Sequence, residues 1–229
     1  MLLSYSAADD GSRFFVALLL VIIGIFAVII LVWWFSLQWI MAQKLRQPTV
    51  DDLLRFNESR IKENSPVPEP AFHRALARAM ALAYYGHSIG SMNQVSAFDM
   101  SGKPEYQNMQ RQVEVINNLL QRRELPQTLA MARECLVAVA PTIEKYKFLN
   151  VGNSHHAWVE IGEVLNDVAT AETIARLERR FRRSTVMLKP AIAWGLCIAY
   201  SRRHDERGKQ MKAWWLNAVP YCKPFQNTE

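Results

Sequence analysis

The chain has 229 residues and a formal net charge of +6, and its mean hydropathy is near zero because one very apolar segment offsets a polar remainder. Its three cysteines, Cys135, Cys197 and Cys222, are widely spaced and form no C-x-x-C pair. This pattern argues against a disulfide framework and against a structural zinc site. We interpret the cysteines as free thiols in a reducing compartment.

Residues 14–35 form an uninterrupted apolar run, FFVALLLVIIGIFAVIILVWWF, without a charged or amide side chain. At ~1.5 Å per helical residue the run spans ~33 Å, which matches the hydrocarbon core of a bilayer. It is too long for a cleaved signal peptide, and no small-x-small cleavage site follows it. We therefore expect a retained transmembrane helix over residues 14–42, preceded by a short tail of residues 1–13.

The flanks of this run predict its orientation. Aromatic and basic side chains favour the headgroup level at the end of a span. The residues expected at this interface are Trp33, Trp34, Trp39, Lys44 and Arg46. Only Arg13 is basic before the run, whereas Lys44, Arg46 and Arg55 follow within twenty residues. The positive-inside rule then places the remainder of the chain in the cytoplasm, with the short N-terminal tail outside. A periplasmic domain is the alternative.

The remainder is long enough for one well-buried domain. Apolar residues recur at spacings of three and four with little glycine, so we expect an all-α fold: a juxtamembrane helix and a Pro-rich linker over 43–70, then a basic all-α domain over 71–229. The helix that begins near residue 71 should end at Gly86, a residue suited to a helix C-terminus.

Four further local features carry predictions. Residues 87–104 lose the helical period, so they form either a long functional loop or contain a short helix. Pro126 and Pro141 bracket a helix, and Ser154 is placed to cap the next one. Residues 190–200, PAIAWGLCIAY, are the most apolar stretch of the domain and are too short to span a bilayer, so we expect a central core helix.

Basic residues are concentrated near the C-terminus. Between Arg176 and Lys212 the chain has eleven basic and three acidic residues, about +8 in a chain of +6. The residues expected to bind a partner are Arg176, Arg179, Arg180, Arg182, Arg183, Arg202, Arg203, Arg207, Lys209 and Lys212. Within RLERRFRR, positions 176, 179, 180 and 183 share one helical face. The planar guanidinium group of arginine binds carboxylates and phosphates through two parallel hydrogen bonds.

Such a surface fits two kinds of partner. Anionic lipid is one, because the anchor already holds the domain at a membrane. Acidic segments of other proteins are the second. Nucleic acid is disfavoured, because no recognition motif accompanies the charge. The structural alternative is a solvated helix face with local pairs such as Arg176–Glu172 and Arg182–Glu178.

One stretch, NSHHAWVEIGEV, resembles a catalytic or metal site. His156 and Glu160 are four residues apart on a helix, and His155 adjoins them. Two ligands do not make a metal site, and the H-E-x-x-H arrangement is absent. The chain also lacks a Gly-rich phosphate loop and G-x-S-x-G. We therefore expect no enzyme activity, no catalytic residue, no metal and no cofactor, and we keep a membrane-tethered enzyme or metal-binding protein that uses His155, His156 and Glu160 as the alternative.

The C-terminal sequence AWWLNAVPYCKPF carries a frame, Leu216-Asn217-x-Val219 followed after four residues by Pro224-Phe225. It resembles the DotM-like coupling-complex accessory subunit of type IVB secretion and IncI-type conjugation systems. The upstream stretch AIAWGLCIAYSRRHDERG is similar to that family's apolar helix with an Arg-rich end. The resemblance covers about the last 40 residues. It implies an inner-membrane protein with a cytoplasmic helical domain and basic patches that receive acidic signals on exported proteins.

These features lead to one hypothesis. The chain is a non-enzymatic, single-pass membrane subunit of a multiprotein assembly such as secretion or conjugation machinery. Its basic cytoplasmic domain would dock acidic protein partners or anionic lipid.

Overall fold

The computed structural model describes residues 6–61, 68–145 and 152–225, and within them the fold is all-α, as predicted. The helices, in chain order, are α1 (Ser6–Leu45), α2 (Asp51–Arg60), α3 (Pro70–Tyr84), α4 (Ser88–Ser96), α5 (Pro104–Leu120), α6 (Leu125–Lys145), α7 (Asn153–Leu165), α8 (Ala171–Arg183), α9 (Lys189–Arg202) and α10 (Arg207–Ala218), with a 3-10 turn η2 (Lys223–Phe225). The chain divides into two compact units, Met1–Ile40 and Met41–Glu229.

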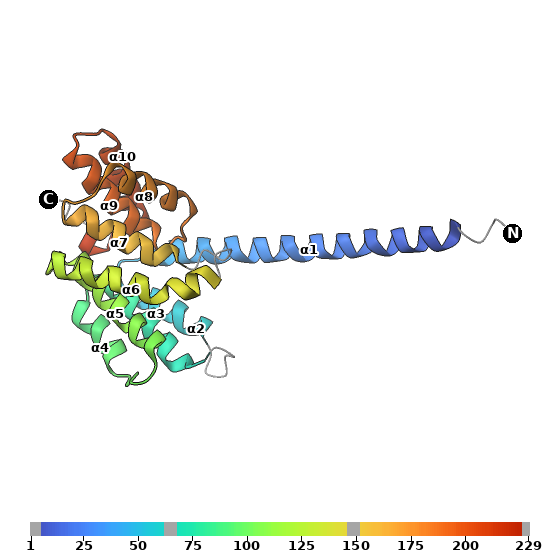
Figure 1. Ribbon diagram of the computed structural model, residues 1–229, viewed down its shortest axis with the longest axis horizontal. Coiled ribbons are helices and arrows are strands. Elements are labelled where there is room, and N and C mark those ends of the chain that lie inside the picture. The colour runs from blue at the N-terminus through green and yellow to red at the C-terminus, as the bar shows by residue number, and fades with distance from the viewer. Residues whose placement is uncertain (1–5, 62–67, 146–151, 226–229) are drawn as a thin grey trace. The chain divides into compact units, whose positions relative to one another are not determined.

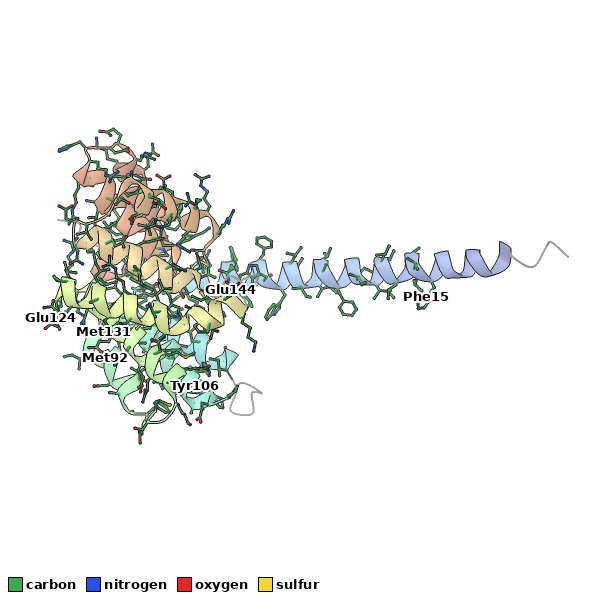
Figure 2. The ribbon with its side chains drawn as sticks, viewed as in Figure 1. Phe15, Met92, Tyr106, Glu124, Met131 and Glu144 are labelled. Atoms are coloured by element: carbon green, nitrogen blue, oxygen red, sulfur yellow. The ribbon has the colours of Figure 1, made fainter. Side chains whose placement is uncertain are left out.

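The first unit is most of α1. Among the described residues, α1 contains the one helix segment, Phe15–Leu45, that is long and apolar enough to cross a membrane, and none of its apolar window is buried. The side chains of residues 15–36 are all exposed, beginning at Phe15 (Figure 2). Such a surface is unfavourable in water and suits lipid. The helix begins at Ser6, within the predicted tail 1–13, of which residues 1–5 lie outside the described part.

The second unit is a bundle in three parts. The helices α2 to α5 form one side and α8 to α10 the other, with α6 and α7 between them (Figure 1). Helix α2 packs against α3 and buries Leu53 completely, so the helix predicted for 43–70 belongs to the same compact unit as residues 71–229. The predicted Pro-rich linker at the end of 43–70 lies partly outside the described residues, which stop at Ile61 and resume at Pro68.

Helix α9 is the central core helix, as predicted for residues 190–200. All residues from Pro190 to Tyr200 are buried, and Trp194 is fully buried. The Trp194 ring meets the Phe225 ring edge-on, with 5.8 Å between the centroids. Gly195 permits a close approach of α7, because a Cβ there would lie 3.1 Å from Cγ1 of Ile161.

Some of the predicted helix boundaries agree with the structure and others do not. Gly86 follows α3 with φ +83°, the left-handed conformation that favours glycine, as expected for a helix C-terminus. Residues 87–104 contain the short helix α4, which confirms the second of the two alternatives. Helix α6 continues past Pro141 to Lys145.

The predicted cap at Ser154 is wrong. Helix α7 begins one residue earlier, at Asn153, with Gly152 in the N-cap position. The side chain of Asn153 is instead directed to α8, where Arg180 and Ser184 bind it. The capping box in this region belongs to α8: the Thr170 hydroxyl accepts a hydrogen bond from the backbone N–H of Thr173.

Candidate functional site

The arginine-rich helix α8 is built around a buried carboxylate on α7. Glu160 is 3% exposed and accepts hydrogen bonds from Nε of Arg176 (3.0 Å) and Nε of Arg180 (2.8 Å), one on each carboxylate oxygen. A buried charge is tolerated only when it is paired and hydrogen-bonded, and Glu160 meets both conditions. We call Arg176 and Arg180 the inner pair.

Further contacts fix the inner pair in place. Arg180 donates from Nη1 to Oδ1 of Asn153 (3.0 Å). Nη1 of Arg176 lies 3.0 Å from a carboxylate oxygen of Glu172, which is the local ion pair named among the sequence alternatives. Nη2 of Arg176 also donates to the hydroxyl of Thr173 (3.3 Å). Most of the donors on these two guanidinium groups are therefore used inside the domain.

Three other arginines of α8 differ from the inner pair. Arg179, Arg182 and Arg183 are exposed, and their side chains form no ion pair within the part of the chain that the structure describes. The alternative pair Arg182–Glu178 is not formed, because Glu178 accepts hydrogen bonds from the hydroxyl of Tyr200 (2.5 Å) and from Nη1 of Arg207 (2.9 Å). We call Arg179, Arg182 and Arg183 the outer trio.

The basic residues that follow α8 mostly have internal partners. Arg202 donates to the backbone carbonyl of Val164 and lies 3.3 Å from a carboxylate oxygen of Asp167. The remaining contacts join Arg203 to the carbonyl of Ala169, Arg207 to Asp205 and Glu178, and Lys209 to Glu206. Hydrogen bonds from Arg207 lower the pKa of the Asp205 carboxyl. Lys212 is exposed and also has an internal contact.

A hollow of about 220 Å³ lies on the shared face predicted for α8. Its lining residues are Asn153, Arg176, Arg179, Arg180 and Arg183. The structure thus gathers the four arginines of the i, i+3, i+4, i+7 set around one depression. The sequence analysis missed Asn153, although its position seven residues before Glu160 placed both on one face of α7.

The histidines of α7 lie beside this surface. Burial lowers the pKa of His156, and the charges of Arg180 and Arg176 lower it further. Burial lowers the pKa of His155, whose Nδ1 lies 2.9 Å from the amide oxygen of Gln112. Burial raises the pKa of the Glu160 carboxyl, although the two guanidinium groups oppose this shift.

This arrangement bears on the alternative metal site. Both carboxylate oxygens of Glu160 are bound by the inner pair, so Glu160 is not available as a ligand. Among the described residues, no group of three His, Cys, Asp or Glu side chains could hold a metal ion. The described cysteines are buried free thiols, and burial raises the pKa of Cys135 to about 11 and of Cys222 to about 12.

The residues expected at the membrane interface fall on both units. Trp33, Trp34 and Trp39 are exposed on α1. Arg46 is exposed, and Lys44 lies 3.9 Å from a carboxylate oxygen of Asp52. The Tyr85 hydroxyl donates to the backbone carbonyl of Gln47 (2.9 Å) and lies 3.3 Å from the carbonyl of Lys44. The backbone at residues 44–47 is therefore hydrogen-bonded within the second unit.

Within the part of the chain that the structure describes, the fold and this surface define an all-α protein with one helix long and apolar enough to cross a membrane and with a domain that carries arginines without an ion pair. No protein-family model, no curated protein and no solved structure matches the chain.

Proposed function

We propose that the chain is a non-enzymatic, single-pass membrane subunit of a multiprotein assembly, and that the outer trio docks an acidic surface of another subunit. One observation carries this proposal: three exposed arginines on one 13-residue helix have no acidic partner among the described residues, whereas both arginines of the neighbouring inner pair bind Glu160. Three uncompensated charges at such spacing repel one another, and an acidic partner relieves that cost.

The C-terminal resemblance supports our proposal for the nature of the assembly. Secretion or conjugation machinery of the DotM-like kind places such a subunit in the bacterial inner membrane with its helical domain in the cytoplasm. The frame residues Val219 and Phe225 are buried, whereas Leu216 is exposed, so part of this frame is accounted for by packing. Anionic lipid headgroups are the second candidate partner, because an anchored domain stays near the membrane surface.

Partner recovery from membranes tests the docking role. The variant Arg179→Glu, Arg182→Glu, Arg183→Glu should lose the proteins that copurify with the wild-type chain. The matched control, Arg55→Glu, Arg111→Glu, Arg123→Glu, makes the same charge change at exposed positions on other elements and should retain them. Equal recovery from both variants at physiological salt would contradict the proposal, and loss of binding to anionic vesicles alone would assign the surface to lipid.

Topology is tested separately. The native cysteines are buried, so they can remain in place while single cysteines are introduced at Ser6 and at Ser96, which is exposed on α4. A membrane-impermeant thiol reagent should label only the Ser6→Cys variant in intact cells. Labelling of only the Ser96→Cys variant would place the domain outside and remove the basis for a coupling-complex role.

A further inference from the structure

The hollow on α8 has a feature that a flat basic surface lacks: some of its guanidinium groups are held in place before any ligand arrives. Arg176 and Arg180 both use Nε to bind Glu160, which fixes the planes of their guanidinium groups. Asn153 is fixed in turn, because its amide donates to the Ser184 hydroxyl (2.7 Å) while its oxygen accepts from Arg180. Prior ordering of donors lowers the entropic cost of binding an anion.

The charges around the hollow leave a surplus. Four arginines line it, and Glu160 and Glu172 lie within 3.0 Å of the inner pair. A third carboxylate, Glu163, lies 3.8 Å from Arg176, but it is balanced by Arg133 (3.1 Å), which lies outside the hollow. Arg179 and Arg183 remain uncompensated by described residues. The local surplus is therefore about two positive charges, which matches a dianion better than a single carboxylate.

A second, independent feature favours an anion at the same place. Asn153 is the first residue of the 13-residue helix α7, and the first turn of α7 contains no acidic side chain. The N-terminus of a helix carries a partial positive charge and backbone N–H groups that anions bind. The neighbouring His156 adds no charge at neutral pH, because burial and the inner pair lower its pKa.

We propose that this hollow binds one phosphate group in its dianionic form, with Arg179 and Arg183 as the principal donors and with Arg180 and Asn153 as the fixed wall. The phosphate belongs either to free phosphate or to a lipid headgroup. This phosphate site deepens the docking role proposed above and rests on the same surface. The compact ligand lies in the hollow, and Arg182 does not bind it because Arg182 lies outside the hollow.

Thermal unfolding of the full chain in phosphatidylcholine vesicles tests this inference. At constant ionic strength, orthophosphate should raise the melting temperature of the wild-type domain, whereas acetate and chloride should not, because a ligand stabilises the state that binds it. The variant Arg179→Gln, Arg183→Gln should need at least about tenfold more phosphate for the same rise in melting temperature. The reason is that the loss of each charge-assisted hydrogen bond weakens binding by about that factor.

The control variant is Arg182→Gln, Arg123→Gln, which removes the same charge at exposed positions outside the hollow. It should keep the wild-type response to phosphate. If the two double variants respond alike, or if acetate acts as strongly as phosphate, the stabilisation is general screening and the inference is overturned. Failure of the phosphate site can be distinguished from failure of the docking role. If phosphate does not raise the melting temperature, reversal of the outer-trio charges can still abolish copurification of protein partners.

A second arm identifies the source of the phosphate. In vesicles that contain phosphatidic acid, a lipid-occupied hollow should abolish the response to added orthophosphate that is seen in phosphatidylcholine. An unchanged response assigns the hollow to free phosphate. Both results support a phosphate site, and the absence of any phosphate-specific shift in phosphatidylcholine contradicts it.

Discussion

The arginines of α8 serve two different purposes. The inner pair, Arg176 and Arg180, binds a carboxylate that is 3% exposed, and this contact joins α8 to α7. The outer trio, Arg179, Arg182 and Arg183, is exposed on the same helix and has no ion pair among the described residues. A count of the charges along a helix therefore does not distinguish the charges that stabilise the fold from the charges that are available to a partner.

Removing the inner pair should have the largest effect on stability. The variant Arg176→Ala, Arg180→Ala leaves Glu160 buried without a partner, which costs about 3–5 kcal/mol of the free energy of unfolding. For a domain of this size that lowers the melting temperature by roughly 6–20 °C. Circular dichroism of the full chain during heating measures it.

A third substitution checks the cause. Adding Glu160→Met to that variant removes the buried charge, so it should recover much of the lost stability. If the double variant melts like the wild-type chain, the inner pair contributes nothing to the fold.

The free energy of unfolding should depend on pH through His156, which lies beside the inner pair. Its pKa is lowered by burial and by Arg180 and Arg176, so the unfolded chain binds the proton more readily than the folded chain. Stability is therefore unaffected by His156 above its ordinary pKa of 6.5 and decreases as the pH falls from 6.5 towards the lowered value. Between pH 7.5 and 5.5, the wild-type chain should lose more stability than His156→Gln, as measured by urea unfolding. An equal loss in both would show that His156 does not contribute.

The outer trio should have the smallest effect on stability. Replacing Arg179, Arg182 and Arg183 by Gln should change the free energy of unfolding by less than about 0.5 kcal/mol, because exposed side chains without partners contribute little. At low salt a slight gain is expected from reduced repulsion between neighbouring charges. Urea unfolding at two salt concentrations measures both. A loss above about 1 kcal/mol would mean that these arginines have structural partners.

Much of the fold could be predicted from sequence. Apolar spacing indicated an all-α fold, and the length of the run 14–35 separated α1 from α9, which contains the most apolar stretch of the domain but is short enough to be buried. The cap at Ser154 was predicted wrongly, because a serine before a helix is only a local preference. The contacts of Asn153 with α8 involve residues about thirty positions away, so they could not be deduced from the local sequence.

One geometric feature of the candidate site could be predicted from the sequence. The spacing of the α8 arginines correctly placed four of them on one face, which the structure gathers around a hollow. It did not show that Glu160 lies beneath two of them, since that depends on how α7 and α8 pack. The polar positions Asn153, His156 and Glu160, spaced three and four apart on one face of α7, were the available signal of a polar contact.

Binding of a synthetic Glu-rich peptide to the full chain in detergent tests the central claim most directly. Fluorescence anisotropy would compare the wild-type chain with the outer-trio Gln variant and with the control Arg55→Gln, Arg111→Gln, Arg123→Gln. The account predicts that the outer-trio variant binds at least about tenfold more weakly at physiological salt, with an unchanged melting temperature. Equal affinity of all three chains would contradict a docking role for the outer trio.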